Sequence, residues 1–177
     1  NNKKLYSIED VKNANWRDIV SLKSSSDQVW NIDTYKDEKD WGVLLHFALS
    51  KIIYINDKKD VLDNLLVQGK CSELDHRRLD KSLTSILSDK EVMPFFSDGW
   101  NVKTEKEILL EDGSSYIPDR FIYNKDSAVV IDYKTGKRRE KDKSQIIEYS
   151  HILSKLGYKD VERVLIYTSQ KNKVVKV

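Results

Sequence analysis

Two β-like runs separated by a short turn constrain this chain more than any other feature of its sequence. Residues 115–123 and 127–135 are rich in aromatic and β-branched side chains, and residues 124–127 between them are typical of a turn. A hairpin symmetric about the centre of that turn places Asp119 directly opposite Asp132, with Cβ atoms about 5 Å apart. Two bare carboxylates that close repel by roughly 3 kcal/mol at an effective dielectric constant of about 20. The pair therefore predicts a compensating cation or a shared proton, and a hard divalent ion with oxygen ligands is the natural candidate.

A lysine follows the second of these acids on the same side of the strand. Lys134 lies two residues after Asp132, and strand side chains alternate between faces, so both point the same way. Asp132 also follows four apolar residues, which indicates that it emerges from a buried strand. An acid and a lysine in such a place are costly unless both charges are used. Beside a metal ion, the lysine would orient or help to deprotonate a water molecule, or stabilise charge that develops on a phosphate.

A helix is expected after this strand. Apolar side chains recur with a helical period over residues 141–156, and Gly157 follows in the position of a C-cap. Gln145 and Tyr149 are four residues apart and are therefore neighbours on one face of that helix. Both side chains could contact a phosphate or the scissile strand of a nucleic acid. Taken alone, the same spacing is more often the edge of a helix that packs against a core.

Together these motifs resemble those of the PD-(D/E)XK nucleases, and within them the RecB-like branch. The matching segments are Pro118-Asp119, Asp132-Tyr133-Lys134-Thr135-Gly136 and residues 145–149. Further upstream, residues 41–46 resemble the Gly-x-x-x-His helix of that branch, and residues 104–108 resemble its acid-bearing strand. The resemblance spans about residues 41–168, most of the chain. The Asp-Tyr-Lys-Thr-Gly and Gln-x-x-x-Tyr combination is fairly specific, whereas a Pro-Asp pair alone is not.

The resemblance implies an α/β fold with a restriction-endonuclease-like core, in which helices flank a mixed central β-sheet in the order α-β-β-β-α-β. The hydrophobic pattern agrees with this order. We expect helices at about 38–55, 73–88 and 141–156, and strands at about 101–110, 115–123, 127–135 and 161–168. Ser72 is expected to cap the second helix, and residues 173–177 could add an edge strand. In such a fold the site lies where the central strands splay apart.

A metal site at that position would carry out phosphodiester hydrolysis. The ligands of Mg²⁺ or Mn²⁺ that the resemblance implies are Asp119, Asp132, His46 and the backbone carbonyl of Tyr133. Glu105 would assist directly or through water, and Glu107, which has the same strand parity, is the alternative. The products would be a 5′-phosphate and a 3′-hydroxyl. DNA is the usual substrate of the family, and nothing in the sequence separately excludes RNA.

The catalytic set that the resemblance implies contains the two aspartates and three further side chains. Lys134 would position the attacking water, and Gln145 and Tyr149 would hold the scissile strand in line. A catalytically silent module has little reason to contain so many costly polar groups, so the set His46, Asp119, Asp132 and Lys134 favours an enzyme.

Four basic residues near these motifs are candidates for contacts with DNA: Arg120, Lys137, Arg138 and Arg139. The net charge of the whole chain is only +2, so there is no global nucleic-acid signature. Basic residues are nevertheless clustered in the loop after the second strand, and a basic loop beside a metal site would meet phosphates. The alternative for each loop residue is a solvated position, and Arg120 is equally expected to pair with a nearby acid.

The length and the cysteine content of the chain indicate its domain organisation and its cellular location. We expect one nuclease domain over residues 1–177, with its core at about 41–168 and an N-terminal extension or helical accessory part at 1–37. The chain starts with Asn1 rather than Met, which suggests a domain of a longer protein. Cys71 is alone, so a four-cysteine iron–sulfur cluster is excluded and a reducing, cytoplasmic location is expected. No membrane-spanning segment or signal peptide is visible.

The order of the motifs, and a chain end shortly after the last strand, resemble the C-terminal nuclease domain of a UvrD-type helicase–nuclease. That resemblance implies an exonuclease that processes double-strand breaks in recombination repair, with single strands fed to it by a helicase motor domain of the same longer chain. Two alternatives stay open. One is a stand-alone endonuclease or junction resolvase of the same superfamily, and the other is a catalytically silent DNA-binding module on the same fold.

Overall fold

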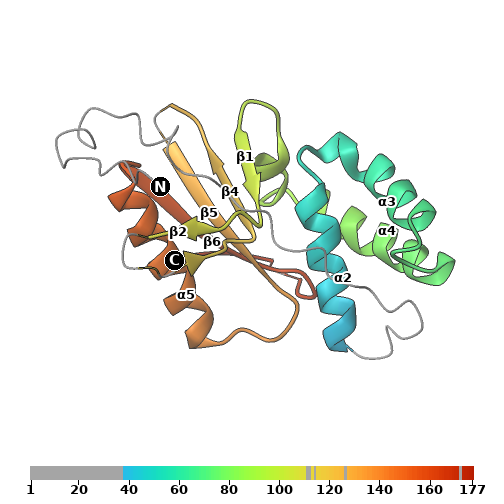
Figure 1. The fold of residues 1–177 in the computed structure, drawn as a ribbon. Helices are drawn as coiled ribbons and strands as arrows, with labels where there is room; N and C mark the ends of the chain where they lie inside the picture. The colour runs from blue at the N-terminus through green and yellow to red at the C-terminus, as the bar shows by residue number, and fades with distance from the viewer. Residues whose placement is uncertain (1–37, 111–112, 114, 126, 172) are drawn as a thin grey trace, which may run out of the picture.

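The computed structural model describes residues 38–110, 113, 115–125, 127–171 and 173–177. The expected N-terminal extension at 1–37 lies outside these residues. The described part has a mixed α/β fold, in which helices cover both faces of a five-stranded mixed sheet (Figure 1). This confirms the expected α/β class and the mixed sheet flanked by helices.

Five strands form the main sheet, in the spatial order β1-β4-β5-β6-β7. Their bounds are β1 (Asn101–Thr104), β4 (Arg120–Tyr123), β5 (Ser127–Lys134), β6 (Asp160–Tyr167) and β7 (Val174–Lys176). Strand β4 is antiparallel to both β1 and β5, β6 is parallel to β5, and β7 is antiparallel to β6. Parallel neighbours need a crossover connection, and α5 (Glu140–Lys155) supplies it between β5 and β6.

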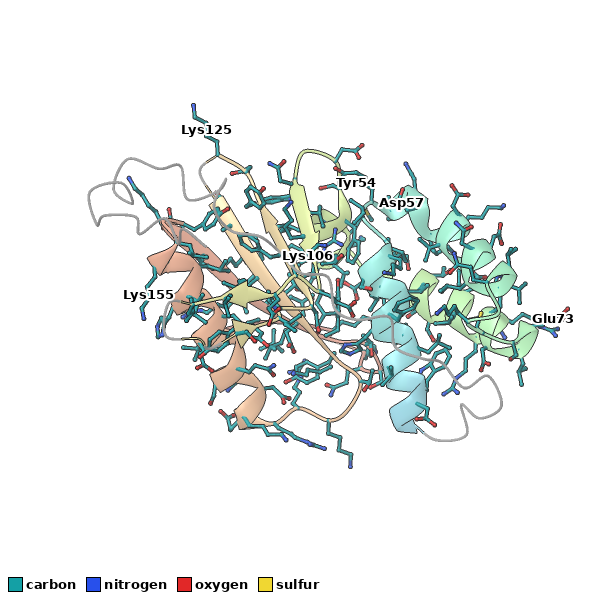
Figure 2. All side chains as sticks on the ribbon, in the orientation of Figure 1. Tyr54, Asp57, Glu73, Lys106, Lys125 and Lys155 are labelled. Carbon is teal, nitrogen blue, oxygen red and sulfur yellow. The ribbon has the colours of Figure 1, made fainter. Side chains whose placement is uncertain are left out.

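The β4–β5 hairpin has the predicted register. Arg120 pairs with Ile131 and Phe121 pairs with Val130, so the next position along brings Asp119 opposite Asp132. At the other end of the hairpin the turn is closed by a hydrogen bond from the Ser127 backbone N–H to Asn124 Oδ1 at 2.8 Å. Lys125 marks this tip in Figure 2, where its side chain points away from the sheet. The two acids therefore lie at the end of the hairpin remote from its turn.

Two of the expected strands are interrupted, which corrects the prediction. The expected strand at 101–110 divides into β1 and β2 (Ile108–Leu109), and the one at 115–123 divides into β3 (Ser115–Tyr116) and β4. Strands β2 and β3 pair with each other as a separate small antiparallel sheet. The breaks fall at Glu105, which has a left-handed φ of +46°, and around Pro118, which has no N–H for a ladder hydrogen bond. The parity argument that placed Glu107 on the face of Glu105 is therefore wrong.

Three helices pack on one face of the main sheet. They are α2 (Glu38–Lys51), α3 (Lys58–Val67) and α4 (Glu73–Leu87), and α2 lies between the sheet and the other two (Figure 1). Ser72 caps α4 as predicted, because its Oγ accepts a hydrogen bond from the Asp75 N–H at 3.1 Å. No helix in the described ranges has both the length and the apolar character needed to cross a membrane.

The first of these helices ends earlier than the expected residue 55. Asp57 Oδ2 accepts hydrogen bonds from the backbone N–H groups of Ile53 and Tyr54, which favours a turn over further helix. A 3₁₀ turn over Ile55–Asp57 follows, and Figure 2 labels Tyr54 and Asp57 at this end of α2. Helix α3 was not predicted. A second 3₁₀ turn, Met93–Phe96, connects α4 to the sheet.

The sheet separates two hydrophobic cores. Val129, Ile131 and Tyr133 of β5 pack toward α2, α3 and α4, whereas Ala128 and Val130 pack toward α5. Because strand side chains alternate, Asp132 and Lys134 share the α5 side at the carboxyl end of β5. With the small β2–β3 sheet left aside, the order from α4 onward is α4-β1-β4-β5-α5-β6, with one helix before three strands of the main sheet and one helix between β5 and β6.

Candidate active site

Two carboxylates meet at the carboxyl end of β5. Asp119 Oδ2 accepts a hydrogen bond of 2.7 Å from the Tyr133 N–H, which fixes this acid beside the strand that carries Asp132. Asp132 is only 3 % exposed. Burial raises the pKa of Asp132 to about 6, and the negative charge of Asp119 adds to the effect. The predicted pairing of the two acids is therefore present, and it makes simultaneous ionisation costly.

Lys134 supplies the positive charge nearest to this pair. Its Nζ lies 2.6 Å from Asp132 Oδ2 and donates a hydrogen bond of 2.9 Å to Gln145 Oε1. At this distance the ammonium group makes a charge-assisted contact with Asp132, which lowers the pKa of Asp132 and so opposes the effect of burial. A buried carboxylate oxygen in this state retains lone pairs that a cation can use.

Helix α5 adds two polar side chains to the same network. Gln145 Nε2 donates a hydrogen bond of 2.9 Å to the Tyr149 hydroxyl, which in turn donates to the carbonyl of Ile117 at 3.4 Å. Asp132, Lys134, Gln145 and Tyr149 thus form a connected series of contacts that ends close to Asp119 in the chain. Gln145 and Tyr149 are neighbours on one face of α5, as their spacing predicted, while their part in catalysis stays a prediction.

His46 reaches the acids from the opposite face of the sheet. Its Nδ1 lies 3.5 Å from Asp119 Oδ2, and its ring meets the Tyr133 ring edge-on with centroids 5.9 Å apart. Burial lowers the pKa of His46, but the hydrogen bond to Asp119 and the charges of both acids outweigh it, so the net pKa is raised. His46 thus lies beside Asp119, and its role as a metal ligand stays a prediction.

A glycine one turn earlier on α2 explains how the helix comes so close. A Cβ atom on Gly42 would lie 3.0 Å from Thr135 Oγ1, in the loop that follows β5. Figure 1 shows this loop passing beside α2. The Gly-x-x-x-His spacing therefore has a physical reason, because the glycine allows the close approach and the histidine then faces the end of β5.

Glu105 also joins this cluster. Its backbone N–H donates a hydrogen bond of 3.1 Å to the carbonyl of Asp119, and Lys106, the next residue, is labelled in Figure 2 between the main sheet and α2. Burial raises the pKa of Glu105, a hydrogen bond with Ser50 opposes this shift, and the charge of Asp119 reinforces it. Glu105 is therefore an electrostatic neighbour of the acid pair.

The chemistry of these donors fits a hard divalent ion. Two carboxylates, one imidazole and backbone carbonyls are ligands that Mg²⁺ or Mn²⁺ accepts, and Asp132 Oδ2 is a buried oxygen with coordinating capacity to spare. In the described ranges, no three histidine, cysteine, aspartate or glutamate side chains converge as a ligand set in their present rotamers.

Arg120 corrects one prediction. It is fully buried, so it does not contact DNA from this position, and it forms no ion pair within the described structure. Its guanidinium donates to the carbonyls of Ile52, Ile53 and Phe95 at 2.8, 2.7 and 3.1 Å, and lies 4.1 Å from the centroid of Phe96. Strand alternation turns Arg120 toward α2, so it fastens the end of that helix to β4 beside Asp119.

The three basic loop residues are all exposed. Lys137 and Arg139 line a cleft of about 1020 Å³ that reaches His46 and Lys134, whereas the Arg138 guanidinium lies 5.3 Å from the centroid of the Tyr167 ring. Contacts with DNA by these three residues stay a prediction. Sequence reasoning missed that Arg78 and the turn at 168–170 also line the cleft. Their sequence offers no signal, because Arg78 looks like part of an exposed helix face.

Comparison with known proteins does not assign this chain to a family. No protein-family model matches the chain, and no curated protein matches it. The resemblance to the PD-(D/E)XK nucleases therefore depends on the motifs themselves and on how their residues lie together.

Proposed function

We propose that this chain is a Mg²⁺- or Mn²⁺-dependent deoxyribonuclease with a restriction-endonuclease-like core of the RecB-like type. The observation that carries the proposal is the connected set of polar side chains at the carboxyl end of β5. That set consists of Asp132, Lys134, Gln145 and Tyr149, and Asp119 lies beside it, where it accepts a hydrogen bond from the Tyr133 N–H. With the small β2–β3 sheet left aside, the order α4-β1-β4-β5-α5-β6 supports the proposal, since it corresponds to the α-β-β-β-α-β order of that core.

Asp119 and Asp132 would hold the ion, together with His46 and the Tyr133 carbonyl, and Glu105 would assist directly or through water. When bound, the ion would supply polarisation of the scissile phosphate and a lowered pKa for a water molecule. Ion binding would also relieve the repulsion between the two carboxylates, which is the main unfavourable feature of the cluster.

Lys134 would orient the attacking water and stabilise charge that develops on the phosphate. Its ammonium group is held between Asp132 and Gln145, so its direction is fixed before any substrate enters. Tyr149 holds Gln145 in turn, and Tyr149 itself is tied to the Ile117 carbonyl. Gln145, which is exposed, is available to contact the strand whose bond is cleaved. Hydrolysis would leave a 5′-phosphate and a 3′-hydroxyl.

Within this class, we infer an exonuclease that acts in double-strand-break processing and recombination repair, attached to a helicase motor domain of a longer chain. The order of the acid-bearing segments supports this context. The cleft that reaches His46 and Lys134 also supports it, because a strand end could enter the site along it. End-labelled DNA distinguishes the modes: ladders from one end indicate an exonuclease, whereas discrete internal cuts indicate an endonuclease or a resolvase.

The test is cleavage of single-stranded and duplex DNA with Mg²⁺, Mn²⁺ or EDTA. Asp132→Asn and Lys134→Ala should each lower the rate by about 100- to 1000-fold. The matched controls are Asp89→Asn and Lys173→Ala, because the buried Lys173 and the partly buried Asp89 form another lysine–aspartate pair, with Nζ and Oδ2 3.6 Å apart, outside the cluster. Both controls should cleave at nearly the wild-type rate once folded. Full activity in either site variant would sink the catalytic assignment.

A further inference from the structure

A cleft of about 1020 Å³ opens beside the candidate active site. One wall is formed by Trp41, Leu45 and His46 of α2 with Arg78 and Ser82 of α4, and the other by the loop after β5 and the turn after β6. The two loops are tied together, because Thr168 N–H donates to the Lys134 carbonyl at 2.9 Å and Ser169 Oγ donates to the Thr135 carbonyl at 2.9 Å. Both walls are thus held by elements that also position the site.

The charge that lines this cleft is one-sided. Arg78, Lys134, Lys137 and Arg139 are cations, and the acid among the lining residues is Asp142. Asp142 is buried, and its Oδ2 accepts hydrogen bonds from the Tyr167 hydroxyl and the Arg139 N–H. Arg78, Lys137 and Arg139 form no ion pair with a carboxylate in the described structure. Their charges therefore face a ligand space that also contains hydroxyl and amide donors.

Arg78 is held in one orientation. Its guanidinium carbon lies 3.8 Å from the centroid of the Trp41 ring, and Trp41 itself packs against the core between the helices and the sheet. Stacking on an aromatic face pre-orients the planar guanidinium, whose fork of N–H groups matches the oxygens of a phosphate. Trp41 acts here as a support for the arginine, and its ring is not free on that side to stack on a base.

A second cleft provides a comparison within the same molecule. It has a volume of about 600 Å³ and lies at the other end of β5, where Ser127, Ala128 and Val129 line it. Its charged lining residues are balanced, with Lys159 and Arg163 facing Asp160 and Glu162. One-sided charge is thus a property of the cleft at the site and not of every hollow on the surface.

We propose that this cationic cleft binds a single-stranded nucleic acid through its phosphates, with Arg78, Lys137 and Arg139 as the contacting side chains. The proposal rests on the proposed function, because the bound strand would be the substrate of the site that the cleft reaches. The volume is at the upper end of the range for small-ligand pockets, which suits a few nucleotides of one strand and not a duplex. A cationic groove that follows a backbone is the usual means of holding a single strand.

Binding of a fluorescein-labelled single-stranded DNA of about 16 nucleotides, followed by anisotropy in EDTA, tests the proposal without cleavage. Arg78→Gln and Lys137→Gln should each weaken binding by about fivefold and reduce the salt slope of log K by about 0.7. Arg78→Lys, which retains the charge but loses the stacked fork, should lie between wild type and Arg78→Gln. The matched control is Lys159→Gln, an exposed lysine of the second cleft, which should bind like wild type.

The outcomes separate this surface from the nuclease proposal. Binding of the strand by wild type that weakens in Arg78→Gln and Lys137→Gln would support the surface. If the same wild-type protein shows no metal-dependent cleavage, the nuclease proposal is refuted. Cleavage by wild type, with unchanged binding in both glutamine variants, would overturn the surface and leave the nuclease standing. A duplex of equal length that binds as tightly as the single strand would overturn the assignment to single strands.

Discussion

Replacing Asp132 by asparagine should stabilise the folded chain at neutral pH while it removes the proposed activity. Asp132 is 3 % exposed, and burial together with the charge of Asp119 raises its pKa from an ordinary 3.8 to about 6. That difference corresponds to about 3 kcal/mol of unfolding free energy that the ionised carboxylate costs the native state. Asparagine has nearly the same shape without the charge. The expected gain is up to about 3 kcal/mol, and this figure already includes the ion pair with Lys134, which lowers the pKa of Asp132.

The pH dependence of this gain has a definite sign. Because the folded-state pKa of Asp132 is raised, the native state binds a proton that the unfolded state releases between pH 3.8 and about pH 6. The wild-type chain therefore loses stability as pH rises through that interval, and the loss is complete above it. The asparagine variant should match or fall below wild type under acidic conditions and exceed it at neutral pH. Because Mg²⁺ would offset the same repulsion, added Mg²⁺ should raise the stability of wild type and not that of the variant.

Thermal unfolding in EDTA from acidic to neutral pH measures this directly. At neutral pH the melting temperature of Asp132→Asn should rise by up to about 6–12 °C, since about 1 kcal/mol moves a chain of this size by about 2–4 °C. Asp89→Asn is the matched control. It removes the partner of the buried Lys173 and should lower stability instead. An Asp132→Asn variant that is less stable than wild type at neutral pH, or whose gain is the same at every pH, would refute the reasoning.

Three further substitutions probe the supports of the site. Arg120→Met should lower the unfolding free energy by about 3 kcal/mol or more in urea titrations, because three carbonyls lose a buried donor; a change under about 1 kcal/mol would contradict the structure. Gly42→Ala should reduce cleavage more than it reduces stability, since the new methyl group would meet Thr135 Oγ1 at 3.0 Å while helix propensity improves. Ser72→Ala should cost about 1 kcal/mol through loss of the α4 cap and leave the cleavage rate unchanged, so the two measurements together separate fold from site.

Short-range patterns predicted the part of the site that lies on the hairpin. The turn at 124–127 and the alternation of the two strands fix the register, and the register alone brings Asp119 opposite Asp132. Helical periodicity likewise placed Gln145 and Tyr149 on one face of α5, although only the packing of α5 on the sheet brings Gln145 to Lys134. These features depend on contacts within the sequence span 115–156, where local geometry dominates.

Features that depend on distant parts of the chain were not predictable in this way. Arg120 follows directly after the motif acid, so its sequence position suggested a role at the site, but its partners Ile52 and Phe95 are 68 and 25 residues away. The stacking of Arg78 on Trp41 joins two helices whose relative placement no local pattern contains. Helix α3 is short and charged at its start, so its periodicity is weak and tertiary packing decides its existence.

Glu105 shows that backbone strain and charge repulsion coincide at one place. Its φ of +46° is unfavourable by about 1 kcal/mol or more for a residue other than glycine. Its N–H donates to the Asp119 carbonyl, which ties the start of β4 to the end of β1. Its carboxyl group is half-buried near Asp119, whose charge helps to raise the pKa of Glu105. The strained backbone thus places a further acid near Asp119. The divalent ion proposed for this site would offset the repulsion of Asp119 with both Asp132 and Glu105.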